Sequence, residues 1–192
     1  MKYPKLFLLS CLLSLVTASY ATQVQSRPQQ PVNHGALVQQ DFESRVAAYL
    51  KLRATAAGDL PKLKPTDSPA TIAQHEHEFA EKIREARGPA RQGDLFTAAI
   101  SAEFRRLIGI TMHGPDAARI RQSLRSAEPV HLQLRVDDDY PTRVPLQSTP
   151  PTLLLNLPKL PPELDYRVVD RDLFIRDVGA NLIVDYITAV IP

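Results

Sequence analysis

Residues 164–187 of this 192-residue chain read LDYRVVDRDLFIRDVGANLIVDYI, and this stretch decides the fold. Two turn signals, Asp170-Arg171-Asp172 and Gly179-Ala180-Asn181, divide it into three short apolar runs. Because tight turns join antiparallel strands, the stretch predicts a C-terminal meander. The expected strands are 164–169, 173–178 and 182–187.

The middle run also predicts which side chains face the rest of the protein. Side chains alternate along a strand, so Leu173 and Ile175 share one face and Phe174 lies on the other. Phe174 has the charged residues Asp172 and Arg176 at two-residue spacing on its own face. We therefore expect Leu173 and Ile175 to face the main core.

Upstream of the meander, a period of two occurs once more, in residues 130–136. Their apolar members alternate with polar ones and predict a half-buried strand; they are Val130, Leu132, Leu134 and Val136. A proline-dense passage follows and contains the run LLLNL at 153–157. Bounded by prolines, this run is too short for a helix. We expect a buried edge strand or an extended segment packed on the core.

The same proline-rich passage has two functional interpretations. Pro150-Pro151 and residues 158–162 favour the polyproline II conformation. The passage is either a rigid crossover on the sheet or a strip on which a partner docks. We favour the crossover.

The N-terminal half has a helical period instead. Apolar residues recur at a spacing close to 3.6 over 36–57. Ser68-Pro69 is a good helix start, with serine as N-cap and proline at the first helical position. The further helices are expected from there to Gly88, from Asp94 or Thr97 to Ile108, and from Gly114 to about Ser126. Helices followed by strands predict an α+β fold, with about four N-terminal helices on a C-terminal antiparallel sheet and a proline-rich crossover.

Residues 1–21 predict a secretory signal peptide. Lys2 and Lys5 precede an apolar run at 6–16, and Ser19 and Ala21 are the small residues of a cleavage site. The uncharged run is shorter than the ~20 residues that a spanning helix needs, so we expect no stable membrane span after cleavage. Acylation at Cys11, after the lipobox-like Leu8-Leu9-Ser10, would leave a mostly apolar segment on the mature chain.

The predicted domain organisation follows from this start. Residues 22–35 are rich in glutamine and proline and predict a disordered leader. Residues 36–192 then form a single α+β domain, with a helical part at 36–127 and a strand-rich part at 130–192. The expected location is the periplasm or the extracellular space.

Charge and cysteine content exclude several functions. The chain has 23 basic and 21 acidic residues, and the loss of Lys2 and Lys5 leaves them equal in number. A neutral mature chain lacks the cationic field of a nucleic-acid-binding protein, so we expect no nucleic-acid partner. The single cysteine, Cys11, leaves with the signal peptide, so the mature chain has no disulfide.

Two polar clusters are candidates for metal sites. Residues 74–79 read QHEHEF, but a zinc protease needs a second histidine four residues after His75, where Phe79 stands. We interpret His75, His77 and Glu78 as a solvated helix face. Asp137-Asp138-Asp139 lacks the glycine and the later glutamate of a calcium-binding EF-hand loop, and we interpret it as the charged exit of a strand.

Other candidates give no catalytic assignment. Arg119, Arg121 and Arg125 predict surface ion pairs near Asp116 and Glu128. The chain lacks nucleophile-elbow and phosphate-loop motifs. A Ser/His/Asp set can be assembled from many sequences, because geometry and not order defines a triad; here it would use His113 or His131 with Asp138 and Ser148. We predict no catalytic, cofactor-binding or metal-binding residue and no cofactor.

One resemblance covers most of the mature chain. The segment from Pro150 through Leu164-Asp165-Tyr166-Arg167 to Asp185-Tyr186, with residues 103–108 (EFRRLI), resembles a family of small exported bacterial proteins to which no function is assigned. Its strongest stretches are 171–173, 176–177 and 180–185. The resemblance implies a bacterial cell-envelope setting and no catalytic residue.

The sequence thus predicts an exported cell-envelope protein that acts as a non-enzymatic binding or interaction module. Its partner would be another envelope protein or an apolar ligand. Two alternatives stay open. One is a small envelope hydrolase with a site of histidine and carboxylates. The other is a cone-shaped binder whose sheet encloses an apolar cavity, lined by Leu132, Leu134, Phe174 and Ile183.

Overall fold

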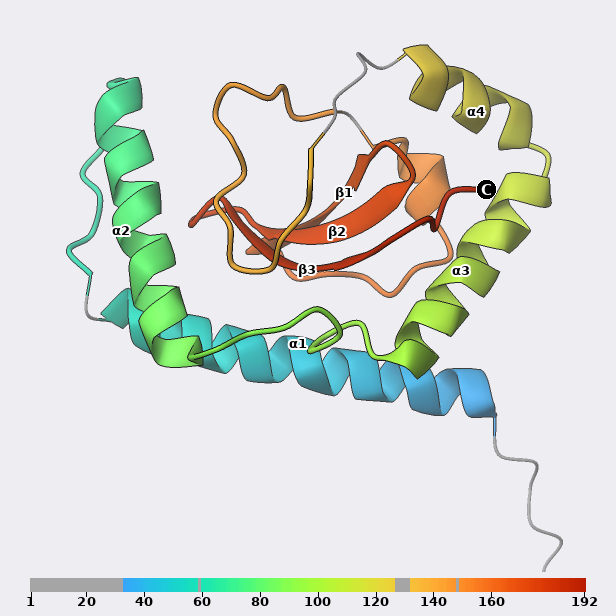
Figure 1. Cartoon of the computed structure of the whole chain (residues 1–192), viewed down its shortest axis with the longest axis horizontal. Coiled ribbons are helices and arrows are strands. Elements are labelled where there is room, and N and C mark those ends of the chain that lie inside the picture. Colours follow the sequence, from blue (N-terminus) through green and yellow to red (C-terminus); the bar gives the residue numbers. More distant parts are fainter. Residues whose placement is uncertain (1–32, 59, 127–131, 148) are drawn as a thin grey trace, which may run out of the picture. The chain divides into compact units, whose positions relative to one another are not determined.

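The C-terminal meander forms as predicted, except that its middle strand begins and ends one residue earlier than expected. Strands β1 (Leu164–Val169), β2 (Asp172–Asp177) and β3 (Leu182–Ile187) pair antiparallel in the order β1-β2-β3 (Figure 1). This is a computed structural model, and it describes residues 33–58, 60–126, 132–147 and 149–192. Residues 33–192 make one compact unit. The predicted signal peptide, most of the predicted leader, and Val130 lie outside the described residues.

Four helices precede the sheet in the described part of the chain, so the α+β class is confirmed. They are α1 (His34–Gly58), α2 (Pro69–Arg87), α3 (Ala98–His113) and α4 (Ala117–Ser126). Ser68 caps α2 as expected, because its Oγ accepts the Thr71 N–H at 3.4 Å. α1 already begins at His34, inside the predicted leader, and α3 continues past Ile108.

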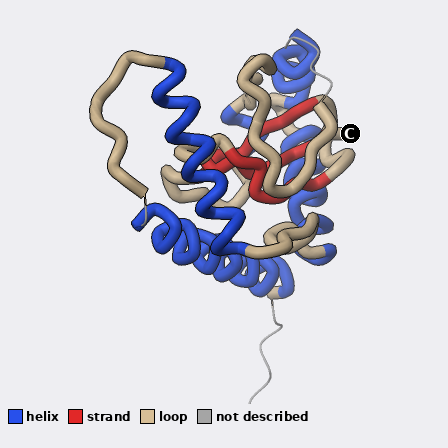
Figure 2. The backbone as a smooth tube through the Cα atoms, turned by 60° about the vertical axis from the view of Figure 1, so that its left-hand side comes forward, coloured by secondary structure: helices blue, strands red, loops and turns tan. Residues whose placement is uncertain are grey.

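The helices surround the sheet on several sides. In Figure 1, α1 runs below the sheet, α2 rises at one end and α3 at the other, and Figure 2 shows the same arrangement from a second direction. Ile83, Ile100 and Ile108 are each 0% exposed and belong to one apolar cluster with the sheet. Leu173 and Ile175 lie in this cluster, so the predicted register is confirmed.

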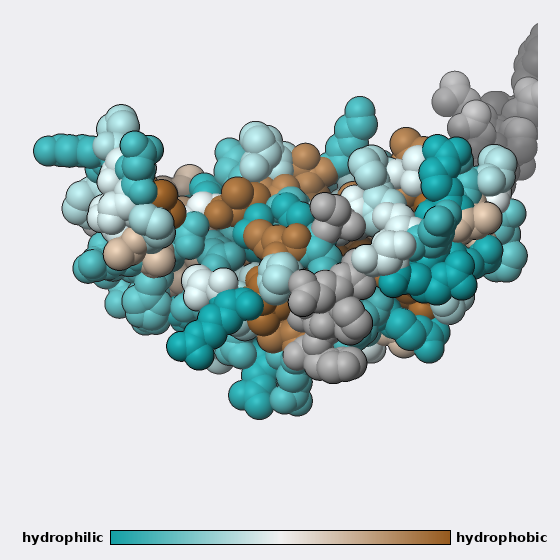
Figure 3. Space-filling model, turned by 90° about the horizontal axis from the view of Figure 1, so that it is seen from above, coloured by the Kyte–Doolittle hydropathy of each residue, from teal (hydrophilic) through white to brown (hydrophobic). Residues whose placement is uncertain are grey.

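The second face of the sheet is buried as well. Phe174 and Ile183 pack with Val169, Leu134 and Tyr140 in a separate apolar cluster. The cover on this face is the irregular segment 132–144, with Tyr140 stacked on Phe174 at 5.8 Å between ring centroids. In Figure 3, which looks from above the view of Figure 1, apolar groups reach the surface as small separate patches.

The strand predicted at 130–136 is wrong for its described residues, 132–136, which form no strand. The chain pairs with the free edge of β3 slightly later, at 137–140. The Asp137 N–H donates to the Ile183 carbonyl at 2.9 Å, and the Tyr140 N–H donates to the Asn181 carbonyl at 2.8 Å. Asp137 has a φ of 64°, and this left-handed turn brings the following residues against β3.

The run LLLNL is also not a strand. Residues Pro151–Leu154 form the single 3₁₀ turn η1, closed by a hydrogen bond from the Leu153 N–H to the Pro150 carbonyl at 2.9 Å. Proline suits this first helical position because its φ is already set and its N–H is not needed. Leu153 and Leu157 are buried in the core, whereas Leu155 is 72% exposed. The prediction that this run packs on the core is therefore confirmed, and the prediction that it is extended is wrong.

Two carboxylates lie on the helix side of the sheet, and a β-bulge in β3 places the first of them, Asp185, there. Ile175 pairs with Asp185 and Arg176 pairs with Ile183, which leaves Val184 as the extra residue. Asp185 thereby shares the face of Ile175, where it accepts backbone N–H groups of Gly93, Leu95 and Phe96. Burial raises the pKa of Asp185, and these hydrogen bonds oppose the rise.

The second carboxylate, Asp177, ties β2 to α1. Its Oδ2 accepts hydrogen bonds from Tyr49 Oη at 3.0 Å and from Arg53 Nε at 2.6 Å. Its Oδ1 accepts the N–H groups of Gly179 and Ala180. Asp177 is 0% exposed, so its charge is balanced entirely by protein groups.

Candidate functional site

A hollow of about 240 Å³ lies where the start of α1, the middle of α3 and residues 156–158 meet. Its apolar floor consists of Val38, Phe104, Leu107 and Pro158. Phe104 is 2% exposed and packs edge-on against Phe42 and Tyr166. The floor is therefore part of the core and keeps its shape.

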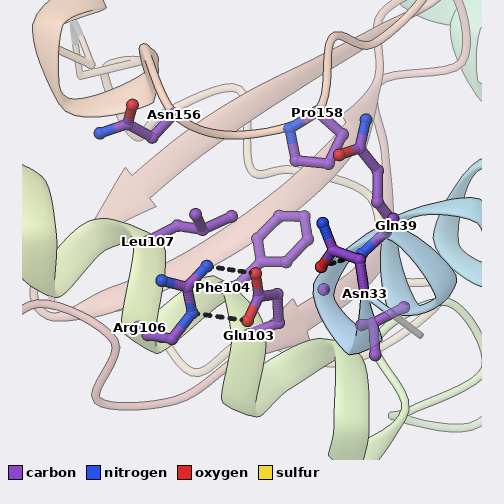
Figure 4. Close-up of a pocket in the computed structure, with 11 residues that line it drawn as sticks. Asn33, Gln39, Glu103, Phe104, Arg106, Leu107, Asn156 and Pro158 are labelled. Atoms are coloured by element: carbon purple, nitrogen blue, oxygen red, sulfur yellow. Dashed lines mark hydrogen bonds and ion pairs between the residues drawn. The ribbon is translucent and has the colours of Figure 1, made fainter. Parts of the chain in front are cut away.

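Polar side chains form the rim of this hollow. Figure 4 shows Asn33 and Gln39 on the α1 side, Asn156 on the opposite side, and the Glu103–Arg106 pair along α3. Asn33 Oδ1 accepts the Ala36 N–H at 3.3 Å. Asn156 Nδ2 donates to Thr111 Oγ1 at 2.9 Å, and Gln39 Nε2 donates to Glu43 at 2.9 Å. These contacts fix the three carboxamides but use only part of their hydrogen-bonding capacity.

The charged pair on the rim is internally balanced. Arg106 donates two hydrogen bonds to the Glu103 carboxylate, at 2.7 and 2.6 Å. The hydrogen bond from Arg106 lowers the pKa of Glu103. α1 comes so close that a Cβ at Gly35 would lie 3.3 Å from Glu103 Oε1. The hollow is thus a neutral site with one fixed, bidentate ion pair.

Apolar residues continue beyond the rim. Ile110 lies one turn after Leu107 on α3 and is 52% exposed, and Leu155 directly precedes Asn156. An apolar floor with a few oriented polar groups is typical of ligand sites. A neutral group that has one donor and one acceptor, such as a peptide bond, can pair with the donors and acceptors that these carboxamides leave unused.

A second hollow, also about 240 Å³, lies between α2 and the segment 139–142. Here the structure joins two clusters that are far apart in the sequence. His77 Nδ1 lies 3.2 Å from Asp139 Oδ2, and both side chains are exposed. Glu76 lines the same hollow and forms no hydrogen bond or ion pair with a described residue. Burial raises the pKa of Glu76, with Arg176 opposing and Asp139 adding to the rise.

The aspartate run mainly binds arginines of α2. Arg84 donates to the Asp139 carboxylate and to the Asp137 carbonyl, the latter at 2.7 Å. Arg87 donates to Asp137 Oδ1 at 2.7 Å. Burial raises the pKa of Asp137, and Arg87 opposes the rise. Within the described residues, no group of three or more His, Cys, Asp and Glu side chains is placed to hold a metal ion.

The remaining sequence candidates lie apart from both hollows. Arg119 pairs with Asp116 at 2.7 Å as expected, and Arg121 donates to the Met112 carbonyl. His113 ends α3, with its Nδ1 2.7 Å from the Gly109 carbonyl oxygen, so it does not meet Asp138 beside β3. His131 and Ser148 lie outside the described residues. The apolar cavity expected at Leu134, Phe174 and Ile183 is filled by these side chains, which are at most 5% exposed.

No family model, curated protein or solved structure matched this chain. None of the helices in the described ranges combines the length and apolar composition needed to cross a membrane. The hollow at Phe104 could not be predicted from the sequence, because its walls come from three distant segments. Glu103 and Arg106 lie in the stretch 103–108, but no spacing rule links them to Gln39 or Asn156.

Proposed function

We propose that this protein is exported to the cell envelope and acts there as a non-enzymatic binding module. Its ligand site is the hollow between α1, α3 and residues 156–158. The observation that carries this proposal is the rigid floor at Phe104 beneath carboxamides with unused hydrogen-bonding capacity. The neutral rim favours an uncharged ligand, because the Glu103 and Arg106 charges already balance each other.

The ligand that fits best is an extended, uncharged segment of another envelope protein. One apolar side chain would occupy the hollow while the adjacent peptide bond meets Gln39 or Asn156. The flanking apolar side chains, Ile110 and Leu155, would contact the neighbouring residues of that segment. Because Pro158 is part of the floor, the proline-rich passage has a role in binding as well as in packing.

A peptide selection tests this function. Random 12-residue peptides displayed on phage are selected on the immobilised mature protein, and the affinity of an enriched peptide is measured by fluorescence anisotropy. Ala36→Phe places a ring in the hollow from an exposed position and should weaken binding by at least about tenfold, or ~1.4 kcal/mol. Ala48→Phe, at an exposed position further along α1, is the matched control. Equal affinity in both variants contradicts the proposed site.

Export itself has a direct measurement. The mature protein should begin near Thr22, because Ser19 and Ala21 fit the cleavage site. Intact-mass analysis of protein from the culture medium or the periplasm gives the start. Retention of Met1, or a lipid on Cys11, contradicts cleavage there.

A small hydrolase is the second candidate, and the His77–Asp139 contact favours it. A carboxylate that holds one imidazole nitrogen orients the other as a general base. Glu76, which lines the same hollow as His77 and Asp139, would then donate a proton to the leaving group. Hydrolysis of p-nitrophenyl acetate by the purified protein, lost in His77→Gln with an unchanged melting temperature, supports this candidate. Equal rates in both proteins reject it.

A further inference from the structure

The linker between α1 and α2 forms a groove that neither candidate function uses. Residues 60–67 arch away from α2 before the chain enters that helix at Pro69 (Figure 2). Two hollows, of about 510 and 310 Å³, lie along this linker. They share the walls Pro61, Lys62, Leu63 and His75, so they are two parts of one groove.

The inner part of the groove is apolar. Its walls beyond the shared residues are Ala57, Leu60 and Phe79. Phe79 is held in place by the Arg53 guanidinium, which lies 4.8 Å from the ring centroid and is itself bonded to Asp177. The apolar surface at this end therefore rests on a fixed part of the core.

The outer part of the groove is cationic. Lys62 and Lys64 line it and form no ion pair or hydrogen bond with a described residue. His75 and the hydroxyl groups of Thr66 and Thr71 add further polar groups. The acidic side chain in this part, Glu78, accepts a hydrogen bond from Gln74 at 2.9 Å. Both lysines thus remain available to an anion.

We propose that this groove binds an anionic amphiphile. The apolar chain enters the inner part against Phe79 and Leu60, and the carboxylate or phosphate headgroup lies between Lys62 and Lys64. Charge complementarity selects the headgroup, and burial of methylene groups supplies the affinity. This site is independent of the hollow at Phe104 and of the His77–Asp139 contact.

Calorimetry with monomeric amphiphiles tests the proposal on the full mature chain. Decanoate and decyl phosphate should bind saturably below their micelle concentrations, and decanol should bind at least about tenfold more weakly. Octanoate should bind more weakly than decanoate, by about fourfold for each methylene removed. Equal affinity for decanol and decanoate, or none for either anion, overturns the proposal.

Two pairs of substitutions locate the site. Lys62→Gln with Lys64→Gln should weaken decanoate binding at least about tenfold, whereas the control Lys51→Gln with Lys159→Gln should not. Ala57→Trp, at an exposed position that lines the inner part, should also weaken binding by filling the groove. A decanoate affinity unchanged in both groove variants contradicts the location.

A separate experiment identifies whether the amphiphile comes from solution or from a membrane. Sedimentation with vesicles of phosphatidylcholine and phosphatidylglycerol shows whether the protein takes the same chemistry from a membrane surface. Binding of decanoate without vesicle binding supports a carrier of free amphiphiles, and binding of both supports lipid capture at the surface. Vesicle binding without decanoate binding means that the lysines merely adsorb to the membrane surface. That result overturns the proposal that the groove binds an amphiphile.

Discussion

The two faces of the sheet are equally buried but covered by different kinds of structure. Ile175 and Phe174 are each 0% exposed, yet Ile175 lies against helices and Phe174 lies under an irregular segment. The helix face depends on close apolar packing across four helices. The other face depends on polar contacts that hold its cover in place, from Arg84 and Arg87 of α2 to residues 137–139. Complete burial thus does not require a regular covering element.

The comparison is tested most strongly by one carboxylate from each face. Asp177→Ala should cost about 3–5 kcal/mol, because it leaves Arg53 without its partner and the Tyr49 hydroxyl without an acceptor. Asp165→Ala should cost only about 1–3 kcal/mol, since the Asp165 side chain is 24% exposed and solvent can replace it. Urea denaturation gives both values. Equal costs would mean that the two faces are electrostatically alike.

Apolar truncations should show the same order. Ile175→Ala should destabilise the fold by about 2–5 kcal/mol, because the surrounding helices cannot collapse into the cavity. Leu134→Ala, in the irregular cover, should cost about 2 kcal/mol, at the lower end, since a loop relaxes more easily. A larger cost for Leu134→Ala in denaturant melts would show that the loop is the more rigid cover.

The pH dependence should have opposite signs on the two faces. Burial raises the pKa of Asp165, but hydrogen bonds from Arg176 and Arg167 bring it below the ordinary value, so its stabilisation is lost as the pH falls through that lowered pKa. Burial raises the pKa of Asp185, so the folded protein binds its proton more tightly and gains relative stability as the pH falls toward the ordinary value of about 3.9.

Asparagine variants of the two carboxylates measure how each one contributes to the pH dependence of stability. As the pH falls below the ordinary carboxyl pKa, the cost of Asp165→Asn should shrink, and as the pH falls toward that ordinary pKa from above, the cost of Asp185→Asn should grow. Unfolding free energies measured across this range give both slopes. Parallel slopes for the two variants would contradict the assignment of the carboxylates.

The smallest effect is expected at the exposed contact between α2 and the cover. Replacing His75, His77 and Glu78 together by glutamine should change the unfolding free energy by about 0.5–1 kcal/mol or less, because the contact between His77 and Asp139 is exposed. Added zinc should leave the melting temperature of the wild type unchanged. A zinc-dependent rise that the triple variant abolishes would reveal a metal site on this helix face.

The sequence predicted those parts of the fold that local patterns control. The β1 and β3 boundaries and the face of Ile175 follow from period-two alternation and turn residues, and the start of α2 follows from Ser68-Pro69. The pairing of residues 137–140 with β3 could not be predicted from local patterns. It depends on the free edge of β3 and on the left-handed backbone conformation of Asp137. The hollow at Phe104 was missed for a similar reason, since tertiary packing alone joins Gln39, Glu103 and Asn156.

The bonds from Tyr49 and Arg53 to Asp177 have a consequence for the order of folding. They join residues that are separated by 128 and 124 positions in the chain, so the tie between α1 and the sheet cannot form until β2 has been made. Closing such long loops is slow, and a chain cut off before β2 would leave the Arg53 guanidinium without its carboxylate. This tie between the start and the end of the described fold can therefore form only when synthesis is nearly complete.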